Sequence, residues 1–224
     1  MTLTLITFDW LPDFPRGFVR DMRVRWCLEE LGRPYRVETV PSHPKSDAHW
    51  QMQPFGQVPV IREKDLTLFE SGAILMHLAE GSALLPGPRR ALVTQWMFAA
   101  LNTVEEASAR WVLMVLAVRM PDFFGPAPDK QVIEFARQGM NARLAPLEEK
   151  LAAQDWLAGD FSIADIAMID VLRVGRSEGA LEGWPALAAY VARGTARPAF
   201  RKAMDDHMAH WQAADHARMA AAPA

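Results

Sequence analysis

The sequence predicts an α/β domain followed by an all-helical domain, on three observations. Over roughly the first 80 residues, short strand-like apolar runs alternate with helical patterns. Proline and glycine are then dense between Gly81 and Pro88, as at a domain boundary. Beyond that stretch, apolar residues recur mainly at helical spacing. The expected division is an α/β domain at residues 1–82, a linker at 83–88 and a helical domain at 89–224.

The α/β domain begins with a strand, a helix and a second strand. Residues 3–8 alternate threonine with Leu, Ile and Phe, which indicates a strand. Residues 20–31 place apolar side chains at helical spacing, and Gly32 with Pro34 ends the helix. Residues 35–40 read as a strand again, so the two strands should be parallel.

A hairpin and a polar helix start follow. Residues 58–61 and 66–69 are apolar runs separated by a charged turn. Ser71 then stands where an N-cap or first-turn residue belongs, beside backbone N–H groups that helices leave unpaired. Such a corner favours a carboxylate or phosphate ligand.

Pro59 has two interpretations. It can be a turn proline before a strand, where its missing N–H does no harm. Alternatively, the Val58–Pro59 bond is cis, as about 5% of X-Pro bonds are in folded proteins. The Val58 N–H and C=O would then be free to pair with an extended peptide ligand.

The helical domain contains two long predicted helices and one specific capping signal. Residues 89–120 and 128–153 carry helical apolar patterns. Ser162 and Asp165 form the S-x-x-D variant of a capping box, which assigns Asp165 a structural role. From about His207 the chain is rich in Ala and His, and we expect a loosely held helix or frayed terminus.

Composition restricts the function classes. The net charge is −3, which gives no general attraction to nucleic acid or anionic membrane. The start MTLTLITFDW does not resemble a signal peptide, and no apolar run approaches 18 residues. Cys27 is the only cysteine, so an internal disulfide is impossible. The histidines have no metal-ligand spacing, so no metal is expected. We expect a soluble, cytoplasmic protein.

Four segments in order, VRWCLEELG (24–32), QPFGQVPV (53–60), LFESGAIL (68–75) and GDFSIADIA (159–167), together resemble the cytosolic glutathione S-transferases over essentially the whole chain. The resemblance implies a thioredoxin-like βαβαββα first domain and an all-helical second domain. It also implies a homodimer related by two-fold symmetry, with active sites between the domains.

The resemblance assigns glutathione contacts to four positions. Val58 should pair its backbone with the cysteinyl part of glutathione, beside a cis Pro59. Ser71 should hold the γ-glutamyl carboxylate with its hydroxyl and N–H, and Glu70 should hold the γ-glutamyl ammonium group. These assignments agree with the anion corner and open strand edge expected from the residues themselves.

The other assignments are less direct. Gln57 and Lys45 are candidates for the glycine end of glutathione. Trp111 and Met114 suit an apolar pocket for the second substrate, and equally suit the protein core or a dimer interface.

The chain departs from the family where catalysis is expected. Family members activate the glutathione thiol with a Tyr, Ser or Cys near the end of the first strand or the start of the first helix. This chain has no serine before Ser42 and no tyrosine before Tyr35, and Cys27 lies inside the helix. Alignment on residues 24–32 places Gly17–Phe18 at the usual serine or cysteine. The chain therefore reads as an atypical, bacterial-type member.

Three substitutes for the missing group are open. The N-terminus of the first helix can favour a thiolate through its dipole and N–H groups. Arg16 or Arg20 can lower a thiol pKa as a nearby cation, or can be solvated surface residues. Trp10 can donate its indole N–H, or form a pocket wall or part of the core. The preferred hypothesis is the helix terminus aided by Arg20.

The leading functional hypothesis is a detoxifying glutathione transferase, an enzyme that stabilises the glutathione thiolate for attack on a small, apolar electrophile. The sequence does not choose between conjugation, reduction, dehalogenation and isomerisation. The alternative is a non-catalytic glutathione-binding or scaffold protein of the same fold. A thiol–disulfide enzyme using Cys27 is a third hypothesis, opposed by the apolar neighbours of this thiol, which predict an inert core residue.

Overall fold

The computed structural model describes residues 2–221, which form two compact units. The first unit combines the chain up to Ser82 with the chain from Ala196 onward, and the second is Ala83–Thr195. The sequence-based boundaries placed residues 89–224 in a single helical domain. The observed units differ because the last helix packs with the first unit.

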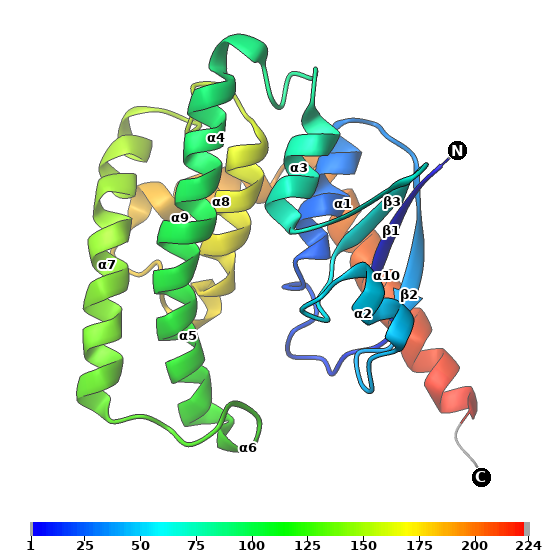
Figure 1. Cartoon of the computed structure of the whole chain (residues 1–224). Coiled ribbons are helices and arrows are strands. Elements are labelled where there is room, and N and C mark those ends of the chain that lie inside the picture. The colour runs from blue at the N-terminus through cyan, green and yellow to red at the C-terminus, as the bar shows by residue number, and fades with distance from the viewer. Residues whose placement is uncertain (1, 222–224) are drawn as a thin grey trace. The chain divides into compact units, whose positions relative to one another are not determined.

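The first unit contains a four-stranded sheet with strand order β2-β1-β3-β4 (Figure 1). β1 pairs parallel with β2 and antiparallel with β3, and β3 pairs antiparallel with β4. This is the predicted thioredoxin-like arrangement. Its elements are β1 (Leu3–Phe8), α1 (Asp21–Glu30), β2 (Tyr35–Val40), α2 (Asp47–Met52), β3 (Val60–Glu63), β4 (Leu66–Phe69), α3 (Ser71–Ala79) and α10 (Pro198–Ala221).

Helix α1 is buried nearly all round. Residues 21–28 are all buried, because α1 packs against β1, α3 and α10. Three of these residues, Asp21, Arg23 and Arg25, are charged. Buried charges have to be paired or hydrogen-bonded, so α1 carries a polar network into the interior of the first unit.

Helix α10 is the main departure from expectation. The segment from His207 is a continuous helix to Ala221, so of the two alternatives the frayed terminus was wrong for the described residues, and residues 222–224 lie outside them. His207 and Trp211 are 0% exposed. With Phe200 and Ala203, which are also buried, they recur at helical spacing on one face of α10. The high Ala and His content concealed this face, because only a few large apolar side chains define it.

The second unit is entirely helical. Its elements are η1 (Gly87–Arg89), α4 (Arg90–Phe98), η2 (Ala99–Val104), α5 (Glu105–Arg119), α6 (Pro121–Phe124), α7 (Lys130–Ala153), α8 (Ile163–Val174), η3 (Arg176–Glu178) and α9 (Pro185–Thr195). The helix predicted at 89–120 is one helical path from α4 to α5, with the π-helical segment η2 between them.

The predicted capping box starts α8. Ser162 is the N-cap, and the Asp165 carboxylate accepts the Ser162 N–H at 2.9 Å. The same carboxylate accepts the Leu157 N–H at 2.9 Å and the Tyr190 hydroxyl at 2.8 Å. Asp165 and Tyr190 are both 0% exposed. Asp165 therefore joins the start of α8 to the preceding loop and to α9, as a structural residue.

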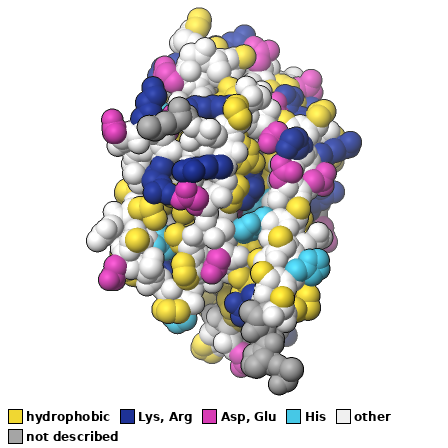
Figure 2. Space-filling model, turned by 90° about the vertical axis from the view of Figure 1, so that its right-hand side faces the viewer, with side chains coloured by type: hydrophobic (Ala, Val, Ile, Leu, Met, Phe, Trp, Pro, Cys, Tyr) yellow, Lys and Arg dark blue, Asp and Glu magenta, His cyan; other side chains and the backbone are white. Residues whose placement is uncertain are grey.

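Between residues 2 and 221, no helix is both long and apolar enough to cross a membrane. In Figure 2, basic and acidic side chains are interspersed over the visible face. This mixture agrees with the small net charge of −3.

Candidate functional site

The hairpin brings two of the predicted glutathione-binding segments together. In the β3–β4 register Val60 pairs with Phe69, so Pro59 before β3 and Glu70 after β4 lie at the same end of the hairpin. The Val58–Pro59 peptide bond is cis, as one of the two interpretations expected. Among residues 2–221 we find no hydrogen-bond partner for the Val58 N–H or C=O.

The corner between β4 and α3 has an unusual backbone. Glu70 is the N-cap of α3 at φ 68° and ψ 114°, a left-handed φ that non-glycine residues seldom adopt. Such conformations concentrate at ligand-binding sites. Ser71 is the first helical residue, 6% exposed, and its Oγ accepts a hydrogen bond from Arg23 Nη1 at 3.3 Å. The corner thus presents a carboxylate and a hydroxyl, with a buried guanidinium behind the hydroxyl.

His49 in α2 supports the approach to Val58, and the sequence reasoning missed it. The side chain is 0% exposed, and Nε2 lies 2.9 Å from the Gln57 carbonyl oxygen. Because a carbonyl only accepts, Nε2 carries the proton in this contact. Its sequence position in a polar stretch gave no signal of burial. His49 fixes the backbone next to Val58, whereas the Gln57 side chain is exposed.

Lys45 lies beside the same loop. Its Nζ is 3.3 Å from the Ser42 carbonyl oxygen and 4.9 Å from the centre of the Phe8 ring. Gly56 has φ +60°, and a Cβ on it would come within 2.5 Å of Lys45 Cδ. The loop before Gln57 therefore needs glycine at position 56, both for its backbone and for the lysine stem.

Two of the three candidate thiol-activating side chains share one partner. Trp10 Nε1 donates to Asp215 Oδ1 at 2.8 Å, and Arg16 donates to both Asp215 oxygens at 2.6 and 2.7 Å. The sequence reasoning did not find Asp215, which lies 199 residues beyond Arg16 in a segment expected to fray. Arg16 and Trp10 therefore already have an anionic partner.

The start of α1 offers fewer free N–H groups than expected. Arg20 is the N-cap of α1, and its side chain is exposed. The Met22 and Arg23 N–H groups donate to the Val19 and Arg20 carbonyls at 3.0 and 3.2 Å. The Gly17 N–H, at the position aligned with the family's serine or cysteine, donates to His207 Nε2 at 3.2 Å.

Cys27 lies in the core of the first unit. Its side chain is 0% exposed, and burial raises the pKa of the thiol to about 12. Both facts agree with the predicted inert core thiol.

We expect Cys27 to stay unmodified by iodoacetamide at pH 8 while the protein is folded, because the reagent needs an accessible thiolate. Mass spectrometry of native and urea-unfolded samples measures this. Rapid alkylation of the native protein would restore the thiol–disulfide hypothesis.

Trp111 and Met114, the predicted second-substrate residues, lie on α5 of the second unit. Trp111 is 6% exposed and Met114 is half-buried. The Trp111 indole N–H has no hydrogen-bond partner among the residues that the structure describes. Trp111 is therefore a mostly buried side chain whose indole N–H is unpaired within the described residues.

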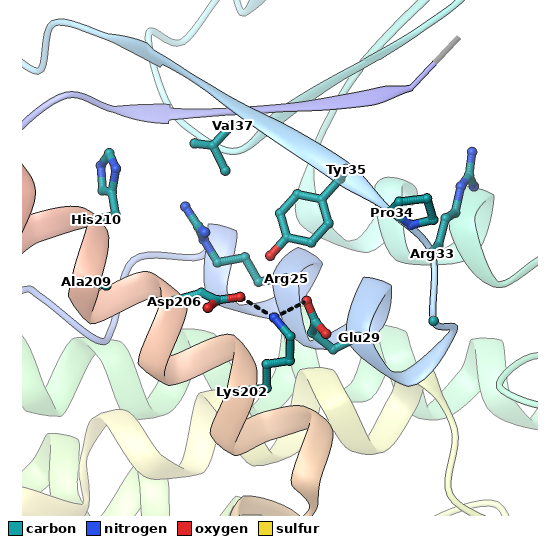
Figure 3. A pocket seen from close by; sticks show the side chains of 11 residues that line it. Arg25, Glu29, Arg33, Pro34, Tyr35, Val37, Lys202, Asp206, Ala209 and His210 are labelled. Carbon is teal, nitrogen blue, oxygen red and sulfur yellow. Dashed lines mark hydrogen bonds and ion pairs between the residues drawn. The ribbon is translucent and has the colours of Figure 1, made fainter.

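A cavity of about 610 Å³ in the first unit lies between α1, β2 and α10 (Figure 3). Its lining includes Arg25, Tyr35, Lys202, Asp206 and His210, and none of the predicted site residues. Lys202 Nζ lies between two carboxylates, at 2.6 Å from Asp206 and 3.3 Å from Glu29 (Figure 3). The cavity is therefore separate from the β3–β4 corner, and ion pairs already engage its lysine.

Comparisons with known proteins agree with this geometry. Residues 15–80 match the model of the glutathione S-transferase N-terminal domain, and residues 108–198 match that of the C-terminal domain. Glutathione S-transferase 3 of Zea mays is 32% identical over 81% of this chain and 86% of its own length. The probable glutathione S-transferase GSTF1 of Oryza sativa subsp. japonica is 32% identical over 64% of this chain and 70% of its own length.

Solved structures agree as well. Glutathione transferase F7 from Populus trichocarpa has a TM-score of 0.77 at 25% identity, covering 92% of this chain and 99% of that one. Glutathione S-transferase-I bound with lactoylglutathione has a TM-score of 0.75 at 25% identity, with the same coverage. The chain therefore belongs to the glutathione S-transferase family.

Proposed function

We propose that the protein is a glutathione transferase that binds glutathione along the Val58 edge and at the Glu70–Ser71 corner. The observation that carries this proposal is the unpaired Val58 backbone at the same hairpin end as the Glu70 corner. A free strand edge suits the cysteinyl backbone of a tripeptide. A helix start with a hydroxyl suits the γ-glutamyl carboxylate.

Each polar group of glutathione then has a proposed partner. The Val58 N–H and C=O pair with the cysteinyl backbone beside Pro59, and Ser71 binds the γ-glutamyl carboxylate. The Glu70 carboxylate takes the γ-glutamyl ammonium group. Gln57 and Lys45 bind the glycine carboxylate, where the lysine cation adds a charge-assisted contact.

The thiol is activated where α1 begins. We propose that the α1 terminus and the exposed Arg20 stabilise the thiolate, since a nearby cation lowers a thiol pKa. Arg16 and Trp10 lie in the segment that leads into α1, but both donate N–H groups to the Asp215 carboxylate. The thiolate sulfur forms a bond to the electrophilic atom of the second substrate, and the leaving group departs with the electron pair of the broken bond.

The second unit supplies the apolar pocket in this proposal. Trp111 and Met114 bind a small electrophile through apolar contact, since methionine adapts to irregular shapes. We further propose that the protein is a cytoplasmic, detoxifying homodimer.

Ultraviolet difference titration of bound glutathione tests the proposal, because the thiolate absorbs where the thiol does not. We expect the bound thiol pKa to lie about two units below its free value, worth about 2.7 kcal/mol between protonation states. Arg20→Ala should return part of this shift. Saturable binding with an unshifted pKa would exclude the transferase mechanism.

The same titration also tests the second candidate function, a glutathione-binding protein without catalysis. One observation favours it: Asp215 occupies the N–H groups of both Arg16 and Trp10. An unshifted thiol pKa together with tight glutathione binding is the result expected for that function.

A further inference from the structure

We propose that Asp215, in the C-terminal helix α10, is a positioning residue that fixes residues 9–20 and thereby sets the pKa of the bound thiol. The segment 9–20 connects β1 to α1 and carries Trp10, Arg16 and Arg20. The inference has two halves: the loop half says that Asp215 fixes residues 9–20, and the thiol half says that it thereby sets the pKa of the bound thiol. The thiol half rests on the proposed function, and the loop half does not.

The first part of α10 is firmly attached to α1. Directly before its first residue, Arg197 donates to both carboxylate oxygens of Glu30 at 2.6 and 2.7 Å. Phe200 packs edge-on against Trp26, with ring centres 4.9 Å apart. Lys202 bridges to Glu29, as Figure 3 shows. All three contacts involve the C-terminal half of α1.

One and a half turns further along α10, the contacts reach the start of α1. His207 Nδ1 lies 3.4 Å from Asp21 Oδ2, and Asp21 is the first residue of α1. His207 Nε2 accepts N–H groups from Trp211 and Gly17 at 3.0 and 3.2 Å. Two donors at Nε2 place the proton of a neutral His207 on Nδ1, toward Asp21. Because the start of α10 contacts the end of α1 and His207 contacts the start of α1, the two helices run antiparallel.

The difference in length between the helices places Asp215 over the loop. α1 has 10 residues and α10 has 24, so their lengths are about 15 and 36 Å. Because His207 is level with the start of α1, the helix beyond it extends past α1. Its next neighbours are the end of β1, where His210 Nε2 lies 2.9 Å from the Phe8 carbonyl oxygen, and then residues 9–20.

Asp215 links two residues of the loop, Trp10 and Arg16, through its carboxylate. Its carboxylate receives one hydrogen bond from Trp10 and two from Arg16, and Arg16 also donates from Nε and Nη2 to the Leu11 carbonyl oxygen at 3.0 and 2.7 Å. The Arg16 side chain is 7% exposed. Hydrogen bonds from Arg16 and Trp10 lower the pKa of Asp215 to about 2. The carboxylate is therefore ionised at any pH used for an activity measurement.

Through these contacts Asp215 can position the thiol-activating groups without touching glutathione itself. A paired arginine and an engaged indole N–H hold the segment that leads into Arg20 and the start of α1. Without the carboxylate, Arg16 and Trp10 lose their shared anchor, and the segment gains conformational freedom. The groups that stabilise the thiolate are then no longer held in one place, and preorganisation is lost.

The test compares Asp215→Ala with Asp206→Ala in the full-length protein. Asp206 is a matched control, because it is also a carboxylate on α10 and pairs with a cation, Lys202. It lines the cavity between α1, β2 and α10, whose lining includes no residue of the segment 9–20. Hydrogen exchange of the unliganded protein measures the loop, and ultraviolet titration of bound glutathione measures the thiol. Trp10→Phe, which keeps the ring and removes one hydrogen bond, is a milder second variant.

In Asp215→Ala we expect amide exchange across residues 10–18 to become at least about tenfold faster. The bound thiol pKa should rise by about one unit, a tenfold loss in the thiolate-to-thiol ratio. Asp206→Ala should change neither, and Trp10→Phe should change both in the same direction by less. Glutathione affinity should change less than about threefold in each variant, since the hairpin end is untouched.

Unchanged exchange in Asp215→Ala would overturn the loop half of the proposal. Faster exchange with an unchanged thiol pKa would overturn the thiol half, with the proposed function still intact. A wild-type protein with an unshifted thiol pKa would instead overturn the proposed function and the thiol half together. The exchange rates decide the loop half in that case as well.

Discussion

Replacing Asp165 by alanine destabilises the protein by about 3–5 kcal/mol. The Tyr190 hydroxyl and the Leu157 and Ser162 N–H groups lose their acceptor in a buried place. Each buried polar group left without a partner costs about 1–3 kcal/mol. The lost helix cap costs about 0.5–2 kcal/mol. Part of this cost is already included above, because the Ser162 N–H belongs to both sets of contacts. For a chain of this size the melting temperature should fall by roughly 6–20 °C.

Differential scanning calorimetry measures this, with Asp160→Ala as the control. Asp160 is in the same loop, but its side chain is 82% exposed and, among residues 2–221, pairs only with the surface residue Arg89. Its removal should cost at most about 0.5 kcal/mol. An equal, small effect of both substitutions would show that the capping network does not stabilise α8.

Ser71→Ala weakens glutathione binding by about 10- to 100-fold. A hydrogen bond to a charged group contributes about 1.5–3 kcal/mol, and the Ser71 hydroxyl is the proposed donor to the γ-glutamyl carboxylate. Isothermal titration calorimetry measures the affinity directly. Glu70 is the N-cap of α3, so this substitution removes no cap. It does remove an acceptor of the buried Arg23 Nη1, so the melting temperature should fall by a few degrees.

Ser71→Thr is the matched control, because it keeps a hydroxyl at the same place. It should bind glutathione within about threefold of the wild type if the hydroxyl is the contact. Equal affinity in Ser71→Ala and the wild type would remove the γ-glutamyl corner from the proposed site. A transferase and a glutathione carrier predict the same loss, so this pair tests binding alone.

Local patterns in the sequence predicted the parts of the fold that depend on neighbouring residues. The strands at 3–8 and 35–40 were correct, and so was the Ser162–Asp165 capping box. Each is encoded within a few residues, by alternation or by a side chain that bonds a nearby N–H. The cis Val58–Pro59 bond was one of two alternatives, because a single proline allows both.

Features made by distant residues were not predictable in this way. The Arg16–Asp215 pair joins positions 199 residues apart, and either residue alone resembles an ordinary surface charge. His49 is buried in a helix of six residues, too short to show a period. Helix α10 carries only a few large buried side chains among alanines, so composition suggested a frayed end. In each case tertiary contacts decide the outcome, and local sequence carries little trace of them.

The place of α10 in the first unit has a consequence for protein synthesis. The sheet and α1 leave the ribosome early, but the helix that covers α1 is translated only after the whole second unit. At about 5–20 residues per second, synthesis from Ser82 to the end of α10 takes roughly 7–28 s. During that time the α1 face that later packs against Phe200 and His207 is without its cover. The first unit therefore completes folding only after α10 has been synthesised, although its sheet is made first.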